Sequence, residues 1–196
     1  MSKTNLVSIG CSFTSDKMFI KNPNKLFDVE KFRGYPVWST LLAKKLKMDV
    51  VNLGKIGAGN KYIFDQVFRL EDIDNIGLVV CMWSEWSREN VGTEKTLSYM
   101  AESQRFIKEK ELPYIFIQGV HTYSFPRTPE IRKLIDSPYF EDLENDNFMG
   151  WPIFSEIGGW CIEDKMKESD RFSVYDRHPN KNGHEKIANI LWKHYD

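Results

Sequence analysis

Short apolar runs rich in β-branched residues alternate along this chain with longer stretches in which apolar residues recur at helical spacing. The short runs have the length and composition of buried strands, and the longer stretches have the period of amphipathic helices. This alternation predicts an α/β protein with a mostly parallel sheet and crossover helices. The expected strands are Leu6 to Ile9, Val50 to Leu53, Leu78 to Met82 and Tyr114 to Val120.

Helices are expected between these strands and after the last of them. The final one begins near Asn180, a residue suited to cap a helix N-terminus. Two longer segments follow the first and fourth strands, and segments of this kind often form lids or binding walls. The expected helices are Val37 to Leu46, Asn60 to Leu70, Thr93 to Glu111 and Asn180 to Tyr195, and the two insertions are Phe13 to Pro36 and Pro126 to Lys167.

Length and charge narrow the class of protein. The 196 residues suit one domain, spanning 1–196, with a substantial core. Lys plus Arg (27) nearly balances Asp plus Glu (28), so we expect no extended nucleic-acid binding and no electrostatic attraction to a membrane. The first residues lack the apolar segment of a signal peptide, and no apolar run reaches membrane-spanning length. We therefore expect a cytoplasmic protein, with its oligomeric state left open.

The cysteines indicate neither a disulfide framework nor a metal site. Cys11, Cys81 and Cys161 lie far apart and form no CxxC pair. We expect no metal and no other cofactor.

Polar or glycine-rich segments follow all four expected strands, and the carboxyl ends of parallel strands meet at one edge of a sheet. Asp176 and His178 add an acid and an imidazole just before the last helix. A serine hydroxyl needs such a base to become an effective nucleophile, so the pattern suggests a serine hydrolase. The four segments are Gly10-Cys11-Ser12, Gly54 to Asn60, Trp83-Ser84-Glu85 and His121-Thr122-Tyr123.

Three of these blocks resemble the SGNH/GDSL hydrolases, a family of esterases, lipases and carbohydrate deacetylases. Ile9 to Ser12 resembles the first block, Asn52 to Gly57 the second, and Asp176 to His184 the last. The resemblance implies a flavodoxin-like three-layer α/β/α sandwich. It also implies metal-independent hydrolysis of a small acyl ester, carried by a small molecule or a glycan.

The resemblance further implies a role for each matching residue. Ser12 would be the nucleophile, His178 the general acid and base, and Asp176 the group that orients the imidazole. The main-chain N–H groups of Ser12 and Gly57 would stabilise the oxyanion. Asn60, which closes the glycine-rich segment after the second strand, is a further candidate for oxyanion or substrate binding.

Three positions depart from the family's pattern. Cys11 replaces the usual aspartate before the serine. Ser84-Glu85 stands where the family commonly has the asparagine of the oxyanion hole, and an ionised Glu85 would repel an oxyanion. Ser84 or the Ser12 amide is then the substitute donor, and we expect Glu85 to point aside and pair with Arg88 or a lysine of the first insertion. Asp176 lies two residues before His178 rather than three, and Tyr175 occupies the usual acid position.

Alternatives stay open at several positions. Ser12 could cap the following segment, and the chain could be a non-catalytic carbohydrate-binding or assembly protein that kept the fold. Cys11 could be a nucleophile, although its side chain should point away from that of Ser12. We expect His184 to pack or cap rather than react. Four tryptophans either pack in a satellite core or stack on sugar faces: Trp83, Trp86, Trp151 and Trp160.

Overall fold

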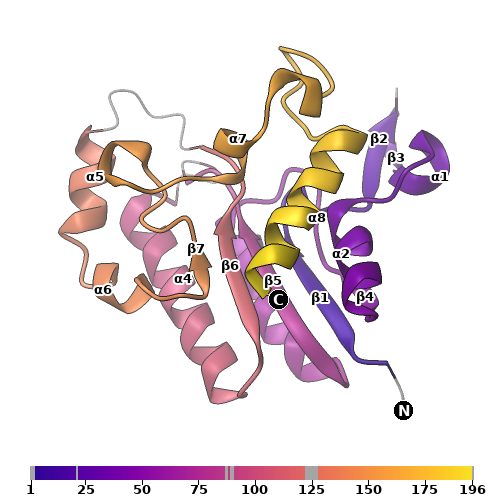
Figure 1. Ribbon diagram of the computed structural model, residues 1–196. Coiled ribbons are helices and arrows are strands. Elements are labelled where there is room, and N and C mark those ends of the chain that lie inside the picture. Colours follow the sequence, from indigo (N-terminus) through magenta and orange to yellow (C-terminus); the bar gives the residue numbers. More distant parts are fainter. Residues whose placement is uncertain (1–2, 21, 87, 89–90, 122–127, 196) are drawn as a thin grey trace.

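The computed structural model describes residues 3–20, 22–86, 88, 91–121 and 128–195. Its centre is a five-stranded parallel sheet of order β4-β1-β5-β6-β7, beside a separate antiparallel hairpin of β2 and β3 (Figure 1). The elements are β1 (Asn5–Gly10), β2 (Lys17–Ile20), β3 (Asn22–Asp28), α1 (Val29–Arg33), α2 (Trp38–Leu46), β4 (Asp49–Asn52), α3 (Asn60–Val67), β5 (Ile76–Trp83), α4 (Thr93–Glu109), β6 (Tyr114–Gln118), α5 (Thr128–Ile135), α6 (Phe140–Leu143), β7 (Phe148–Met149), α7 (Ile162–Lys165) and α8 (Lys181–Tyr195).

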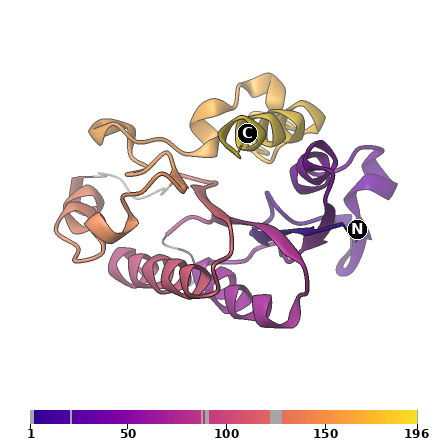
Figure 2. The ribbon, with the colours of Figure 1, turned by 60° about the horizontal axis from the view of Figure 1, so that its bottom comes forward.

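Helices cover both faces of the sheet, which makes three layers (Figure 2). Alternate residues of each strand point to opposite faces, and β5 shows this well. Val79, Cys81 and Trp83 join one core with α3 and α4, whereas Leu78 and Val80 join the other core with α2 and α8. The strand order is that of flavodoxin-like folds, so the expected α/β/α architecture is confirmed.

The four expected strands are all present, with shifted ends. The fourth stops at Gln118, two residues earlier than expected. The expected helix from Asn60 to Leu70 is α-helical only to Val67 and continues as a 3₁₀ turn over Phe68–Asp72. Asn180 caps α8 as expected, because its Oδ1 accepts the N–H of Gly183 at 3.2 Å.

Both insertions contain secondary structure that the sequence pattern did not predict. The segment from Phe13 to Pro36 forms the β2–β3 hairpin and α1, and the described part of Pro126 to Lys167 contains α5, α6, β7 and α7. Among the helices of the described residues, none has the length and apolar character that a bilayer span requires.

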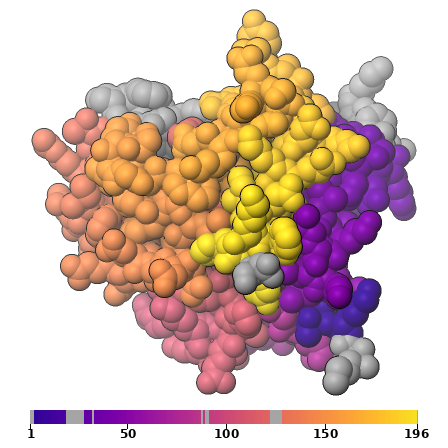
Figure 3. All heavy atoms as spheres, in the orientation of Figure 1, coloured from indigo at the N-terminus to yellow at the C-terminus, as the bar shows by residue number. Residues whose placement is uncertain are grey.

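The segments that follow the strands are tied together at the carboxyl edge of the sheet. The N–H of Lys55 donates to the Gly10 carbonyl at 3.0 Å, and the N–H of Gly119 donates to the Trp83 carbonyl at 2.8 Å. The segment between α7 and α8 stands out from this edge at the top of the molecule (Figures 1 and 3). The sheet thus brings distant parts of the chain to one rim. Thr122 and Tyr123, which belong to the fourth predicted segment, lie outside the described residues.

Candidate active site

Ser12 lies in a tight turn directly after β1. The N–H groups of Thr14 and Ser15 both donate to the Cys11 carbonyl, at 2.9 and 3.0 Å. A side chain at Gly10 would collide with Thr14 and with the Met82 carbonyl, so glycine is required where the strand meets the turn. Cys11 is fully buried in the core beneath α2 and α8, as expected, while Ser12 is partly exposed.

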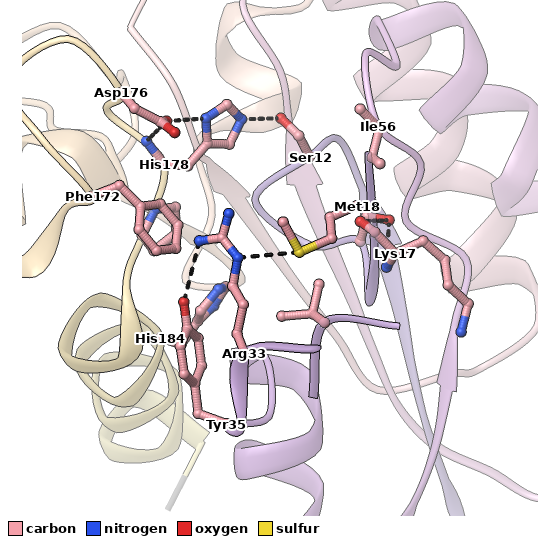
Figure 4. A pocket seen from close by; sticks show the side chains of 13 residues that line it. Ser12, Lys17, Met18, Arg33, Tyr35, Ile56, Phe172, Asp176, His178 and His184 are labelled. Carbon is pink, nitrogen blue, oxygen red and sulfur yellow. Dashed lines mark hydrogen bonds and ion pairs between the residues drawn. The ribbon is translucent and has the colours of Figure 1, made fainter. Parts of the chain in front are cut away.

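A chain of hydrogen bonds links Ser12, His178 and Asp176 (Figure 4). Ser12 Oγ lies 2.8 Å from His178 Nε2, and His178 Nδ1 lies 2.7 Å from Asp176 Oδ1. With Nδ1 protonated toward the carboxylate, Nε2 is free to accept the hydroxyl proton of Ser12. This is the geometry in which an imidazole activates a serine hydroxyl.

A turn that begins at Ser173 brings Asp176 to the imidazole despite the short spacing. Ser173 Oγ accepts the N–H of Asp176 at 2.8 Å, and the Ser173 N–H donates to the Asp176 carbonyl at 3.1 Å. Asp176 Oδ1 then accepts from both the main-chain N–H of His178, at 3.1 Å, and its ring. Tyr175, at the usual acid position, is 98% exposed. A serine followed three residues later by an aspartate, as at Ser173 and Asp176, is a turn signal that the sequence contains.

A buried carboxylate anchors the segment that carries Asp176 and His178. Glu163 of α7 lies 3.2 Å from Arg177 Nε through Oε1, and its Oε2 accepts the N–H of His121 at 2.8 Å. Asn180 adds bonds from its Nδ2 to the carbonyls of Ser169 and Arg171. Sequence reasoning identified Asn180 only as a helix cap and did not identify Glu163 or Arg177, because their partners are distant in the chain.

The loop after β4 positions Gly57. Gly57 has a φ of 74°, which only glycine adopts readily, and space around it is open. Among the described residues, neither the Gly57 N–H nor the Ser12 N–H donates a hydrogen bond to the protein. Both amides are thus free to receive an oxyanion.

Asn60 and Ser84 bond to each other rather than to the site. The Asn60 side chain accepts the Ser84 N–H at 2.8 Å and donates to the Ser84 carbonyl at 3.2 Å, and both residues are buried. Their arrangement fixes the loop after β4 against the end of β5, so they position the Gly57 loop. The Ser84 amide is already bonded and does not replace the missing donor.

Glu85 is also buried and borders neither of the cavities beside His178. Arg88 donates from Nη1 to the Ala58 carbonyl at 3.4 Å, and the pairing of Glu85 with Arg88 or a lysine stays a prediction. Its absence from both linings agrees with the expectation that Glu85 points aside from the oxyanion.

Two cavities flank the imidazole. The first, about 230 Å³, contains Ser12 and His178 and is walled by the first insertion, including Met18, Val29 and Arg33. The second, about 390 Å³, lies on the other side of His178 and is bordered by Phe13, Arg88, Val120, Glu163, Tyr175, Asp176 and Arg177. The first insertion therefore forms a wall of the cavity, although its polar pattern did not predict the hairpin, and a role of this wall in binding stays a prediction.

His184 faces the first cavity but plays a packing role. Its Nδ1 accepts the N–H of Trp38 at 3.3 Å, which joins α8 to α2. Burial, with the nearby charge of Arg33 and His178, lowers the pKa of His184 to about 3. The ring is neutral near pH 7 and does not compete with His178 as a base.

The four tryptophans belong to the cores and not to the site. Trp83 and Trp86 are buried, and Trp151 and Trp160 pack at the edges of the two cores. None of the four borders either cavity beside His178. The structure therefore supports the packing interpretation: Trp83 and Trp86 are covered by protein, and Trp151 and Trp160 are partly buried against the cores.

One cluster of metal-ligand types occurs among the described residues, formed by His121, Cys161 and Glu163. Its groups already have partners: His121 Nε2 lies 2.8 Å from Asp164, and Glu163 holds Arg177. Burial raises the pKa of the Cys161 thiol, which disfavours the thiolate that a metal prefers. The cluster therefore serves to anchor the segment before α8.

No protein-family model and no curated protein sequence matches this chain. Solved structures do match it over nearly the whole length. The psychrotrophic esterase EstA from Pseudoalteromonas sp., in a structure inhibited by monoethylphosphonate, has a TM-score of 0.64 at 12% identity, over 98% of this chain and 96% of its own. A GDSL-like lipase from Bacteroides thetaiotaomicron has a TM-score of 0.52 at 16% identity, over 97% and 86%.

The acetylxylan esterase Axe2 from Geobacillus stearothermophilus, as a tryptophan-to-isoleucine variant, has a TM-score of 0.54 at 15% identity, over 97% of this chain and 94% of its own. Two further Axe2 structures are catalytic mutants in which an aspartate or a histidine is replaced by alanine. At these identities the similarity establishes the fold, and the chemistry of this chain rests on its own residues.

Proposed function

We propose that this chain is a serine esterase of the SGNH/GDSL family that hydrolyses small acyl esters. The observation that carries the proposal is the continuous hydrogen-bonded chain from Ser12 through His178 to Asp176. It lies at the carboxyl edge of a parallel sheet, where such folds bind their ligands. The esterases among the structural neighbours support the same class of reaction.

In the acylation step, Ser12 Oγ attacks the ester carbonyl carbon while His178 Nε2 takes the hydroxyl proton. Asp176 stabilises the imidazolium that forms and keeps the correct ring nitrogen turned to Ser12. The carbonyl oxygen becomes an oxyanion, which the main-chain N–H groups of Ser12 and Gly57 stabilise. His178 then returns the proton to the leaving alcohol, and the acyl group remains on Ser12.

Deacylation repeats the sequence with water. His178 Nε2 takes a proton from the water, whose oxygen attacks the acyl carbon on Ser12. The oxyanion forms again before the acid leaves and Ser12 recovers its proton. Each step uses only groups already placed by the turn after β1, the Gly57 loop and the segment before α8.

The proposal is tested by labelling with a fluorophosphonate, which reacts with activated serines. The label should attach to Ser12 in the wild-type protein, disappear in Ser12→Ala and fall strongly in His178→Ala. Ser15→Ala is the matched control, because Ser15 borders the same cavity but its hydroxyl is bonded to the main chain of Lys17. Mass spectrometry of the labelled peptide identifies the site.

Undiminished labelling of the Ser12→Ala protein would refute the assignment. The missing oxyanion asparagine favours one other function, a non-catalytic binding protein with this fold. That function predicts no turnover of acetyl, propionyl or butanoyl esters together with retained binding of a glycan. The esterase proposal predicts turnover of at least one of these esters, unchanged by chelators.

A further inference from the structure

Arg33, which is partly buried in the wall of the first cavity, makes an unusual set of contacts. Its Nε donates to the Met18 sulfur at 3.1 Å, and its Nη1 lies 3.5 Å from the Tyr35 hydroxyl. The guanidinium carbon stands 3.6 Å above the centre of the Phe172 ring. Thioether sulfur is a weak acceptor, and the bond to Tyr35 is long. Most of the hydrogen-bonding capacity of this guanidinium is therefore unused.

No carboxylate neutralises this charge among the described residues. The other cation of the cavity, Lys17, lies 3.2 Å from Asp28 and 3.4 Å from Asp16. The one acid of the cavity, Asp176, is bonded to His178. Arg33 is thus the charged group of this cavity that has no ionic partner.

The guanidinium is held in place by its surroundings. The Phe172 ring covers one face, and Met18 and Tyr35 bond to two of its nitrogens, which leaves the remaining terminal nitrogen directed toward His178 (Figure 4). A planar guanidinium stacked in this way keeps its donor edge ready for a carboxylate, which it binds with two parallel hydrogen bonds. Because His184 is neutral, it neither adds to nor cancels this charge.

The size of the cavity limits what the arginine can meet. About 230 Å³ accommodates a small group, and the space is shared by Ser12, His178 and Arg33. An anion that binds Arg33 within this space while the ester carbonyl reaches Ser12 would belong to a short molecule. The apolar residues Met18, Val29 and Ile56 line the space between and suit a short hydrocarbon spacer.

We propose that Arg33 is a specificity-determining residue that binds a carboxylate on the substrate, so that this protein prefers short esters carrying one carboxylate to neutral esters of the same size. The inference rests on the proposed esterase function, since it concerns the same site. It adds the chemical class of substrate, a monoanionic ester with the carboxylate a short spacer away from the scissile bond.

Two pairs of esters test the proposal at constant ionic strength and pH 7.5. Monoethyl succinate is compared with ethyl butyrate for a carboxylate in the acyl half, and 4-acetoxybenzoate with its methyl ester for a carboxylate in the alcohol half. In at least one pair the anionic ester should have a kcat/KM about tenfold higher, the size of one charge-assisted contact. The advantage should be lost in Arg33→Met, partly kept in Arg33→Lys, and unchanged in Lys17→Met, the cation already paired with aspartates.

A binding measurement separates this inference from the esterase proposal. The product 4-hydroxybenzoate, or succinate, is titrated calorimetrically into Ser12→Ala and into Ser12→Ala with Arg33→Met, and the second Kd should be about tenfold higher. Binding that depends on Arg33 without turnover of any ester would refute the esterase but keep the carboxylate site. Turnover with equal preference in both pairs, before and after Arg33→Met, would refute the carboxylate site but keep the esterase. Inorganic phosphate competing more strongly than succinate would overturn the carboxylate assignment.

Discussion

At the scale of single residues, the position of Asp176 shows how a local turn compensates for an unusual spacing. One carboxylate oxygen accepts both the main-chain N–H and the ring N–H of His178. The Ser173 hydroxyl holds the turn that makes this possible. Asp176 is half exposed, so its effect comes from orienting the ring rather than from a buried charge.

Asp176→Asn should lower kcat by roughly 10²- to 10⁴-fold, because an amide in this position favours the wrong tautomer of His178. KM for a short ester and the free energy of unfolding should change little. The kinetics of ethyl acetate hydrolysis, followed in a pH-stat, provide the measurement. Asp136→Asn is the control, since Asp136 is exposed and borders neither cavity beside His178, so this variant should leave kcat unchanged. An unchanged kcat in Asp176→Asn would contradict the orienting role.

At the scale of elements, α8 does more than cover one face of the sheet, because its position also affects where the imidazole lies. Its first turn is capped by Asn180, its apolar side packs on the sheet with α2, and His184 accepts the Trp38 N–H at the start of α2. The segment that bears Asp176 and His178 leads directly into this helix. The docking of α8 on α2 therefore determines where the imidazole can stand relative to β1.

His184 should make folding stability depend on pH between about 7 and 5. Its pKa is lowered to about 3 in the folded protein, so below an unfolded-state pKa near 6.5 the unfolded chain binds a proton that the native state does not. Stability is then lost as the pH falls, by about 2 kcal/mol between pH 7 and pH 5 from this residue. Urea unfolding at the two pH values measures it.

His184→Gln supplies the control for this prediction, because glutamine can accept the Trp38 N–H but does not titrate. The variant should lose about 2 kcal/mol less stability than the wild type between pH 7 and pH 5. The same loss in both proteins would show that other groups cause the pH dependence. His194, near the chain end and exposed, offers a comparison variant, His194→Gln, that should behave like the wild type.

At the scale of the whole molecule, the candidate site is assembled from distant segments. The turn after β1, the hairpin insertion with α1, the Gly57 loop and the segment before α8 meet at one edge of the sheet (Figure 1). The insertion forms one wall of the first cavity, whose volume of about 230 Å³ is small beside typical ligand pockets. The shape of the whole rim thus limits the length of the substrate.

The dependence of kcat/KM on acyl chain length should reveal this limit on the length of the substrate. For a series of 4-nitrophenyl esters, kcat/KM should be highest for acetyl to butanoyl and about tenfold or more lower for octanoyl, because the longer chain does not fit between Met18 and Ile56. Met18→Ala, which enlarges the cavity, should raise the octanoyl rate relative to the acetyl rate. A rate that increases steadily to decanoyl would contradict a limit set by the volume of the cavity.

The sequence by itself determined the sheet, most of its helices and the candidate triad. Leu78 to Met82 and its counterparts are apolar on both faces, which only a covered parallel strand requires, and the blocks around Ser12 and His178 each carry a local signal. The hairpin of the first insertion, the short β7 and the ends of the helices depended on tertiary packing, because their own patterns are polar, brief or ambiguous.

Only the tertiary structure decided which polar groups face the site. The Asn60 side chain, a site candidate in the sequence, bonds to the main-chain N–H and carbonyl of Ser84. Arg33, one basic residue among several in its insertion, borders the cavity without a carboxylate partner among the described residues. The physical reason is that a hydrogen-bond partner or an ion pair is a property of groups close in space. Residues Ser12 and His178 lie 166 positions apart, and their 2.8 Å contact exists only because the parallel sheet and α8 bring both to one edge.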